Sequence, residues 1–182
     1  MSVDPSTPIL ATSVTSFSYG QVLWQERRLV VKVAGKLQMD EAAARTRFEI
    51  ALETYEQEFG SFFVVRLLGL EISYPDDFCL VTFPVHDFLF NPQGSYHGGM
   101  LATIMDISVG HLIKYKLGIA GLTLELKSQF MRPLINGPGR CEGRFIRQGR
   151  SVSFLESRLW DGNEKLVAHS TSTWKMIKEV TE

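Results

Sequence analysis

Apolar residues recur at helical spacing over two stretches of the chain and at every second position over several others. The first helical stretch starts after Asp40, a residue that suits a helix N-cap, and is expected to end at Gly60. Its apolar residues share one side, which is typical of the buried side of an amphipathic helix, so we expect them to pack in the interior. These residues are Phe48, Leu52, Tyr55 and Phe59.

A second and longer helix is predicted over residues 100–117, where apolar positions repeat every three to four residues. Gly118 follows as a typical helix end. Asp106 stands inside this otherwise apolar helix, where an ionised carboxylate is costly unless it is hydrogen-bonded or used in chemistry. The repeating positions are Leu101, Ile104, Met105, Ser108 and Leu112.

The segments before the long helix predict two antiparallel strands, at 70–74 and 78–85, joined by a turn at Pro75. The preceding run, 62–68, is ambiguous between a helical turn and a strand.

Four strands in succession are predicted after the long helix. In the first, Leu122, Leu124 and Leu126 alternate with polar residues, so we expect it to be half-buried. The remaining three are separated by turns at 136–139, at 148–150 and at Asp161-Gly162. An antiparallel sheet packed on one long helix makes the protein α+β.

Residues 1–39 form an N-terminal extension of uncertain structure. Alternating apolar positions at 22–24 and 29–33 fit an extra hairpin or a loose arm, and the two capped helices with a basic face that a DNA-binding module needs are not evident. We therefore expect residues 40–182 to form a single domain that includes the leading helix.

Composition narrows the classes of partner. Of 182 residues, 19 are basic and 20 are acidic, so the formal charge of −1 gives no broad attraction to nucleic acid or to an anionic membrane. No run approaches the roughly 20 apolar residues of a membrane span. Cys79 and Cys141 lie far apart in strand-like segments and are expected in the core. We expect a cytoplasmic enzyme.

The loop before the long helix reads Asn91-Pro-Gln-Gly-Ser-Tyr-His97-Gly98-Gly99, and Asp106 and Gly110 follow in the helix. This combination resembles the hot-dog thioesterases of the phenylacetate-pathway (PaaI-like) type, and the resemblance extends over about 63–176. It implies a hot-dog fold, in which an antiparallel sheet wraps around the helix. It also implies hydrolysis of an acyl-CoA thioester, in a homodimer that pairs further into a homotetramer.

The same resemblance assigns roles to single residues. The glycine after the histidine, Gly98, supplies a backbone amide to the oxyanion, and Asp106 activates water against the thioester. Thr123 matches a Ser/Thr position that assists the aspartate, although an ordinary strand threonine remains the alternative. No cofactor is expected, because coenzyme A is part of the substrate.

The predicted positions of Gly98 and Asp106 support the roles that the resemblance assigns to them. Gly98 and Gly99 open a helix, where free N–H groups and the positive end of the dipole favour a developing anion. Asp106 lies eight residues after Gly98, or about 12 Å along the helix axis, so one carbonyl group cannot contact both. A second, antiparallel copy of the helix would bring them together, which makes the predicted site a dimer site.

The remaining candidates surround this centre. Asn91 is expected to position substrate or water, with a plain loop turn as the alternative. His97 is a candidate for the substrate-binding loop and is expected to hold that loop by a hydrogen bond, with a general base as the alternative. His86, His111 and His169 are too scattered for a metal site, and none is predicted. Further candidates for substrate contact are Gly99, Tyr96, Met100, Arg132, Arg147 and Arg150, the arginines toward coenzyme A phosphates.

Two other functions stay open at this point. A dehydratase or hydratase of the same fold would use a different loop and helix pattern for its catalytic histidine and acid. A non-catalytic acyl-CoA-binding protein is opposed by the presence of Asp106. The acyl group itself cannot be read from the sequence.

Overall fold

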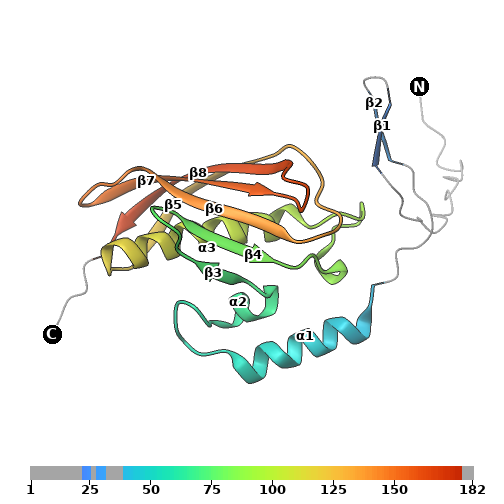
Figure 1. The fold of residues 1–182 in the computed structure, drawn as a ribbon, viewed down its shortest axis with the longest axis horizontal. Coiled ribbons are helices and arrows are strands. Elements are labelled where there is room, and N and C mark those ends of the chain that lie inside the picture. Colours follow the sequence, from blue (N-terminus) through green and yellow to red (C-terminus); the bar gives the residue numbers. More distant parts are fainter. Residues whose placement is uncertain (1–21, 26–27, 32–38, 178–182) are drawn as a thin grey trace, which may run out of the picture. The chain divides into compact units, whose positions relative to one another are not determined.

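The computed structural model describes residues 22–25, 28–31 and 39–177, and the chain divides into two units, Met1–Gln38 and Met39–Glu182 (Figure 1). In the first unit, β1 (Val22–Gln25) and β2 (Arg28–Val31) pair antiparallel, with Val22 opposite Val31. This is the hairpin alternative for the segment. The other N-terminal residues lie outside the described part of the chain.

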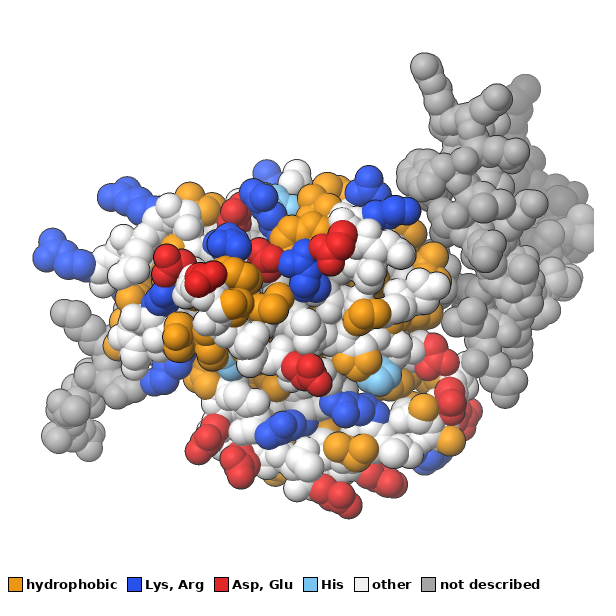
Figure 2. All heavy atoms as spheres, in the orientation of Figure 1, with side chains coloured by type: hydrophobic (Ala, Val, Ile, Leu, Met, Phe, Trp, Pro, Cys, Tyr) orange, Lys and Arg blue, Asp and Glu red, His pale blue; other side chains and the backbone are white. Residues whose placement is uncertain are grey.

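The second unit begins with α1 (Glu41–Thr54), capped by the Asp40 carboxylate, which accepts a hydrogen bond from the Ala43 N–H at 2.9 Å. The expectation that its aromatic stripe packs in the interior is wrong. The helix ends at Thr54 rather than near Gly60, and its one buried residue is Ala51. The stripe residues are between 40% and 51% exposed, and Figure 2 shows apolar and acidic side chains mixed along this lower edge.

The exposure of the stripe has a structural cause. Apolar spacing selects a face of a helix, but burial needs a second layer to cover that face. Among the helices and strands of this unit, α1 packs mainly on the short helix α2 (Phe63–Leu68). There the rings of Phe48 and Tyr55 meet the edge of Phe63 at centroid distances of 5.4 and 6.0 Å. The run left open between helix and strand is therefore a helix, which Gly69 ends at φ +67°.

One six-stranded antiparallel sheet forms the body of the unit, in the order β3-β4-β6-β7-β8-β5. The predicted pair before the long helix is present, and so are the four successive strands after it. The strands are β3 (Glu71–Ser73), β4 (Cys79–Phe83), β5 (Gly121–Phe130), β6 (Gly139–Arg147), β7 (Val152–Trp160) and β8 (Leu166–Met176).

The long helix α3 (Gly98–Leu117) lies along one face of this sheet and contacts β4 to β8 (Figure 1). Gly118, at φ +68°, ends it as predicted. This arrangement confirms the α+β class and the hot-dog architecture, in which the sheet wraps one helix. Cys79 and Cys141 are fully buried between helix and sheet, which confirms their place in the core.

The prediction that the first strand after the long helix is half-buried is wrong for Leu122 and Leu124. β5 is an edge strand, and its pairing with β8 shifts register between Thr123 and Glu125. The shift interrupts the alternation of faces, and none of the described strands covers the outer edge, so Leu122 and Leu124 are 56% and 60% exposed. A row of exposed apolar residues therefore lies at the edge of the sheet.

Candidate active site

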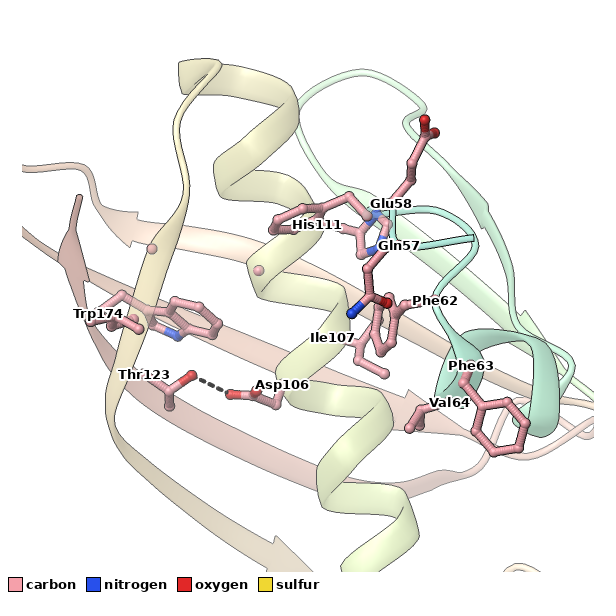
Figure 3. A pocket seen from close by; sticks show the side chains of 14 residues that line it. Gln57, Glu58, Phe62, Phe63, Val64, Asp106, Ile107, His111, Thr123 and Trp174 are labelled. Carbon is pink, nitrogen blue, oxygen red and sulfur yellow. Dashed lines mark hydrogen bonds between the residues drawn. The ribbon is translucent and has the colours of Figure 1, made fainter. Parts of the chain in front are cut away.

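A cavity of about 630 Å³ opens between α3, the edge strand β5, β8 and the segment that leads into α2 (Figure 3). Its walls are largely apolar and aromatic, as in sites that hold small molecules. The lining residues are Gln57, Glu58, Phe59, Phe62, Phe63, Val64, Asp106, Ile107, Gly110, His111, Gly121, Leu122, Thr123 and Trp174.

Asp106 and Thr123 meet in this cavity. The Thr123 hydroxyl on β5 donates a hydrogen bond of 2.9 Å to the Asp106 carboxylate on α3. Burial raises the pKa of Asp106 above its ordinary value, and the hydrogen bond from Thr123 partly offsets that rise. A desolvated carboxylate that keeps one oxygen oriented by a hydroxyl suits a base or a nucleophile.

Trp174 forms the wall beside this pair, and sequence reasoning missed it. Its ring lies between two glycines, because a Cβ at Gly110 or at Gly121 would stand 3.1 or 2.9 Å from the indole. The indole N–H donates to the Ser172 hydroxyl at 3.0 Å, and the residue pairs with Thr123 across the ladder. The Gly110 in the recognised motif was the available signal, since a glycine inside a helix often marks a close approach.

His111 lies at the far end of the cavity. One ring nitrogen, Nδ1, hydrogen-bonds the Tyr74 hydroxyl at 2.8 Å, and Phe59 meets the ring edge-on at 5.3 Å. Desolvation lowers the pKa of His111 below its ordinary value. Among the described residues, no group of three His, Cys, Asp or Glu side chains could hold a metal ion.

The loop before α3 is braced by Asn91. Its Oδ1 accepts from the N–H groups of Gln93 and Ser95 at 2.9 and 3.3 Å, and its Nδ2 donates to the Ser95 hydroxyl at 3.0 Å. These bonds fit the plain turn alternative, and Asn91 does not line the cavity. Its role toward substrate or water stays a prediction.

The helix start distinguishes the two glycines. His97 accepts the Gly99 N–H on its Nδ1 at 2.9 Å, which is the loop-holding hydrogen bond expected of it. The Gly98 N–H has no acceptor among the described residues. Because both glycines stand at the N-terminus of a long helix, Gly98 is the free donor at its positive end. Gly98 and Asp106 lie eight residues apart on the same helix, about 12 Å along its axis.

Tyr96, one of the predicted substrate contacts, is buried within this chain. It is 2% exposed and belongs to the core, where its ring packs against Phe83 and Phe90. Its backbone N–H donates to the Leu134 carbonyl at 2.8 Å. Burial also raises the pKa of the phenol. The burial of Tyr96 could not be predicted from the sequence, because a loop tyrosine before a glycine pair gives no local sign of burial.

The other candidates lie away from the cavity within one chain. Met100 is partly buried against the core. The Arg132 guanidinium donates to the Leu166 carbonyl at 2.7 Å, whereas Arg147 and Arg150 are exposed and form no ion pair within the described residues. Only Asp106 and Thr123 of the predicted residues are thus brought together by the fold of a single chain.

Known proteins are similar to this chain in fold and in sequence. A family model described as the thioesterase superfamily matches residues 93–168. A phenylacetic acid degradation-related protein of Ralstonia eutropha, solved as a structure, is 32% identical with a TM-score of 0.58; the match covers 63% of this chain and 89% of that one. The chain belongs to the thioesterase superfamily. Membership assigns it to the hydrolases and to thioester hydrolysis as a class of reaction, and it confirms the PaaI-like resemblance.

Two further relatives of this thioesterase-superfamily chain widen the comparison. A Saccharolobus solfataricus protein, provisionally named an esterase, is 26% identical over 125 residues, or 68% of this chain and 81% of the relative. A Bacillus halodurans protein solved with CoA shares the fold at a TM-score of 0.71 and 20% identity, and the match covers 79% of this chain and 97% of that one.

Some of the residues that line the cavity lie within the segment matched by the superfamily model, and others lie outside it. Gly98, Asp106 and Thr123 lie within the matched residues 93–168, whereas Trp174 and the segment 57–64 lie outside them. The part of the cavity that faces α2 is therefore built by residues beyond the matched thioesterase segment. No helix among the described residues combines the length and the apolar character needed to cross a membrane.

Proposed function

We propose that the protein hydrolyses an acyl-CoA thioester to a free acid and CoA, with Asp106 as the catalytic carboxylate. The observation that carries this proposal is the partly buried Asp106, hydrogen-bonded to Thr123 in the wall of a largely apolar cavity next to the sheet edge. The cavity receives the acyl group, and its aromatic walls exclude bulk water from it.

The chemistry follows from the carboxylate. As general base, Asp106 takes a proton from a water molecule whose oxygen attacks the thioester carbonyl carbon. The carbon–sulfur bond then breaks, and the departing thiolate takes up a proton to leave as CoA. Direct attack by the carboxylate, followed by hydrolysis of the anhydride, uses the same residue. Thr123 orients the carboxylate in both routes.

The carbonyl oxygen needs a donor that Asp106 cannot provide. The free Gly98 N–H is a suitable oxyanion donor, because it points from a helix N-terminus and His97 occupies only the neighbouring Gly99 N–H. Since about 12 Å of helix separates Gly98 from Asp106, we infer that the donor comes from the partner subunit of a homodimer. The exposed edge of β5 with Leu122 and Leu124 is a suitable surface for the partner.

Coenzyme A as the leaving group is supported by the relative from Bacillus halodurans, which was solved with CoA. Arg147 and Arg150 are exposed and form no ion pair within the described residues, so they can meet phosphate groups. Two free and buried cysteines, Cys79 and Cys141, are typical of a reducing compartment, and a cytoplasmic location is part of the proposal.

Thiol release from a panel of acyl-CoA esters tests the proposed function. Wild-type protein is expected to release CoA thiol from at least one ester, and Asp106→Asn to release it at least a hundredfold more slowly. Binding of the esters without thiol release would indicate a non-catalytic binding protein. A change in the acyl group without thiol release would indicate a hydratase or dehydratase. Either result would contradict hydrolysis.

A further inference from the structure

Two serine hydroxyls converge on one carbonyl oxygen of α3, directly before Asp106. The hydroxyls of Ser108 and Ser157 donate to the Met105 carbonyl at 2.7 and 2.9 Å, and the two hydroxyl oxygens are 3.3 Å apart. Met105, Ser108 and Ser157 are all fully buried. A helix carbonyl ordinarily accepts only the N–H four residues later, so this carbonyl carries unusual additional bonds.

The sheet is shaped to bring Ser157 to the helix. Ser157 belongs to a row of small residues that pair across β4, β6, β7, β8 and β5. Gly143 beside it lets the helix approach closely, because a Cβ there would stand 2.9 Å from atoms of Ser108. The row consists of Cys79, Gly143, Ser157, Ser170 and Ser128.

The bond from Ser157 acts on the backbone of the proposed base. The Met105 carbonyl and the Asp106 N–H belong to one planar peptide group, so holding the carbonyl fixes the plane from which the Asp106 side chain departs. Thr123 on β5 holds the other end of the same residue, the carboxylate. Asp106 is thus tied to the sheet at two points, through its preceding peptide to β7 and through its carboxylate to β5.

We propose that Ser157 is a positioning residue for Asp106, which holds the Met105–Asp106 peptide so that the carboxylate meets the attacking water at the reacting distance. This inference rests on the proposed function. Displacement of a catalytic group by about 1 Å can cost up to a hundredfold in rate, so loss of a backbone anchor should appear in kcat. Ser157 itself does not line the cavity, so substrate binding should not change.

Ser170 provides a matched control. It faces Ser157 directly across the β7–β8 ladder and is 1% exposed, but its hydroxyl has no hydrogen-bond partner among the described residues. Ser157→Ala is expected to lower kcat about tenfold and to leave KM within about twofold. Ser170→Ala, with the same loss of one buried hydroxyl, is expected to keep the wild-type kcat. Should Ser157→Ala fail to fold, Ser157→Cys keeps the volume with a weaker donor and should show a smaller loss of kcat.

A second readout separates positioning from stability. If Ser157 and Thr123 hold the same residue, Ser157→Ala combined with Thr123→Val should lose less kcat than the product of the two single losses. The melting temperature is expected to fall more in Ser157→Ala than in Ser170→Ala, because only Ser157 loses a buried hydrogen bond, so kcat is compared well below both melting temperatures. Equal kcat in Ser157→Ala and Ser170→Ala, or multiplicative losses in the double variant, would overturn the inference.

Asp106→Asn in the same assay distinguishes this failure from failure of the proposed function. If Asp106→Asn keeps wild-type turnover, the catalytic assignment is wrong, and the positioning inference fails with it. If Asp106→Asn is inactive while Ser157→Ala behaves as Ser170→Ala, only the positioning role is wrong.

Discussion

Asp106 of the central helix and Thr123 of the edge strand β5 are joined by a 2.9 Å hydrogen bond, although 17 residues separate them in the chain. The bond links the long helix to the edge strand of the sheet. Burial raises the pKa of Asp106, and the hydrogen bond from the threonine hydroxyl partly offsets that rise.

Replacing Thr123 should therefore move the pH dependence of turnover. Thr123→Val removes the hydrogen bond that lowers the pKa of Asp106, so this pKa rises further. The acidic limb of the kcat/KM profile therefore shifts to higher pH. The rate on the plateau should fall about tenfold, because the carboxylate loses its orientation. Thr123→Ser keeps the hydroxyl and should retain the wild-type limb. An unshifted limb in the valine variant would show that the titrating group is not Asp106.

Asp106→Asn should stabilise the fold at neutral pH while it removes activity. The folded pKa of Asp106 is raised, so its ionised form lowers stability above that pKa. The cost disappears as the pH falls below the unfolded value near 3.8, where the residue is protonated in both states. The gain at pH 7 should be small, because partial solvent contact screens the charge. Urea unfolding of both proteins at pH 7 and pH 3.5 measures it, and an equal difference at both values would contradict the raised pKa.

A mixed dimer tests whether the site is shared. Gly98→Pro removes the proposed oxyanion N–H at the first helical position, where proline is tolerated. Gly98→Pro and Asp106→Ala should each be nearly inactive alone. Co-refolded at random, half of the dimers are mixed and one of their two sites is intact, so about a quarter of wild-type activity should return.

The glycine change has its own control. Gly98→Ala keeps the N–H, and its added Cβ would meet the Phe130 ring at 3.4 to 3.7 Å, an ordinary contact. This variant should stay active. If mixtures that demonstrably contain mixed dimers remain as inactive as their parents, Gly98 and Asp106 do not serve one site.

Gly110→Ala should alter the cavity without touching the proposed chemistry. The added Cβ would stand 3.1 Å from the Trp174 ring, closer than an ordinary contact, so the ring must move by a few tenths of an ångström. We expect KM to rise several-fold with kcat changed less, since the wall moves and Asp106 does not. Gly118→Ala meets no atom within 4 Å, although its φ of +68° adds strain, and it should leave KM unchanged. Equal KM in the two variants would contradict a role for Trp174 in the cavity wall.

Several features could be predicted from local sequence alone. The N-cap at Asp40, the long helix ending at Gly118 and the four strands that follow it depend on residues close to one another in the chain. The motif from Asn91 to Gly110 indicated the superfamily, and Asp106 was a candidate because a carboxylate inside an apolar helix needs a reason.

Only the tertiary structure decided which faces are covered and which side chains meet. The apolar stripe that starts on α1 has helical spacing, but α1 ends at Thr54 and the described elements leave the stripe exposed, and β5 loses its alternation because it bulges at a sheet edge. Tyr96 turns into the core, while Trp174 reaches the cavity from a strand more than sixty residues beyond Asp106. Periodicity records which face of an element is apolar, whereas burial depends on elements distant in sequence that arrive at that face. The sequence therefore determined the elements and the catalytic candidate, and the packing of helix on sheet determined the walls around it.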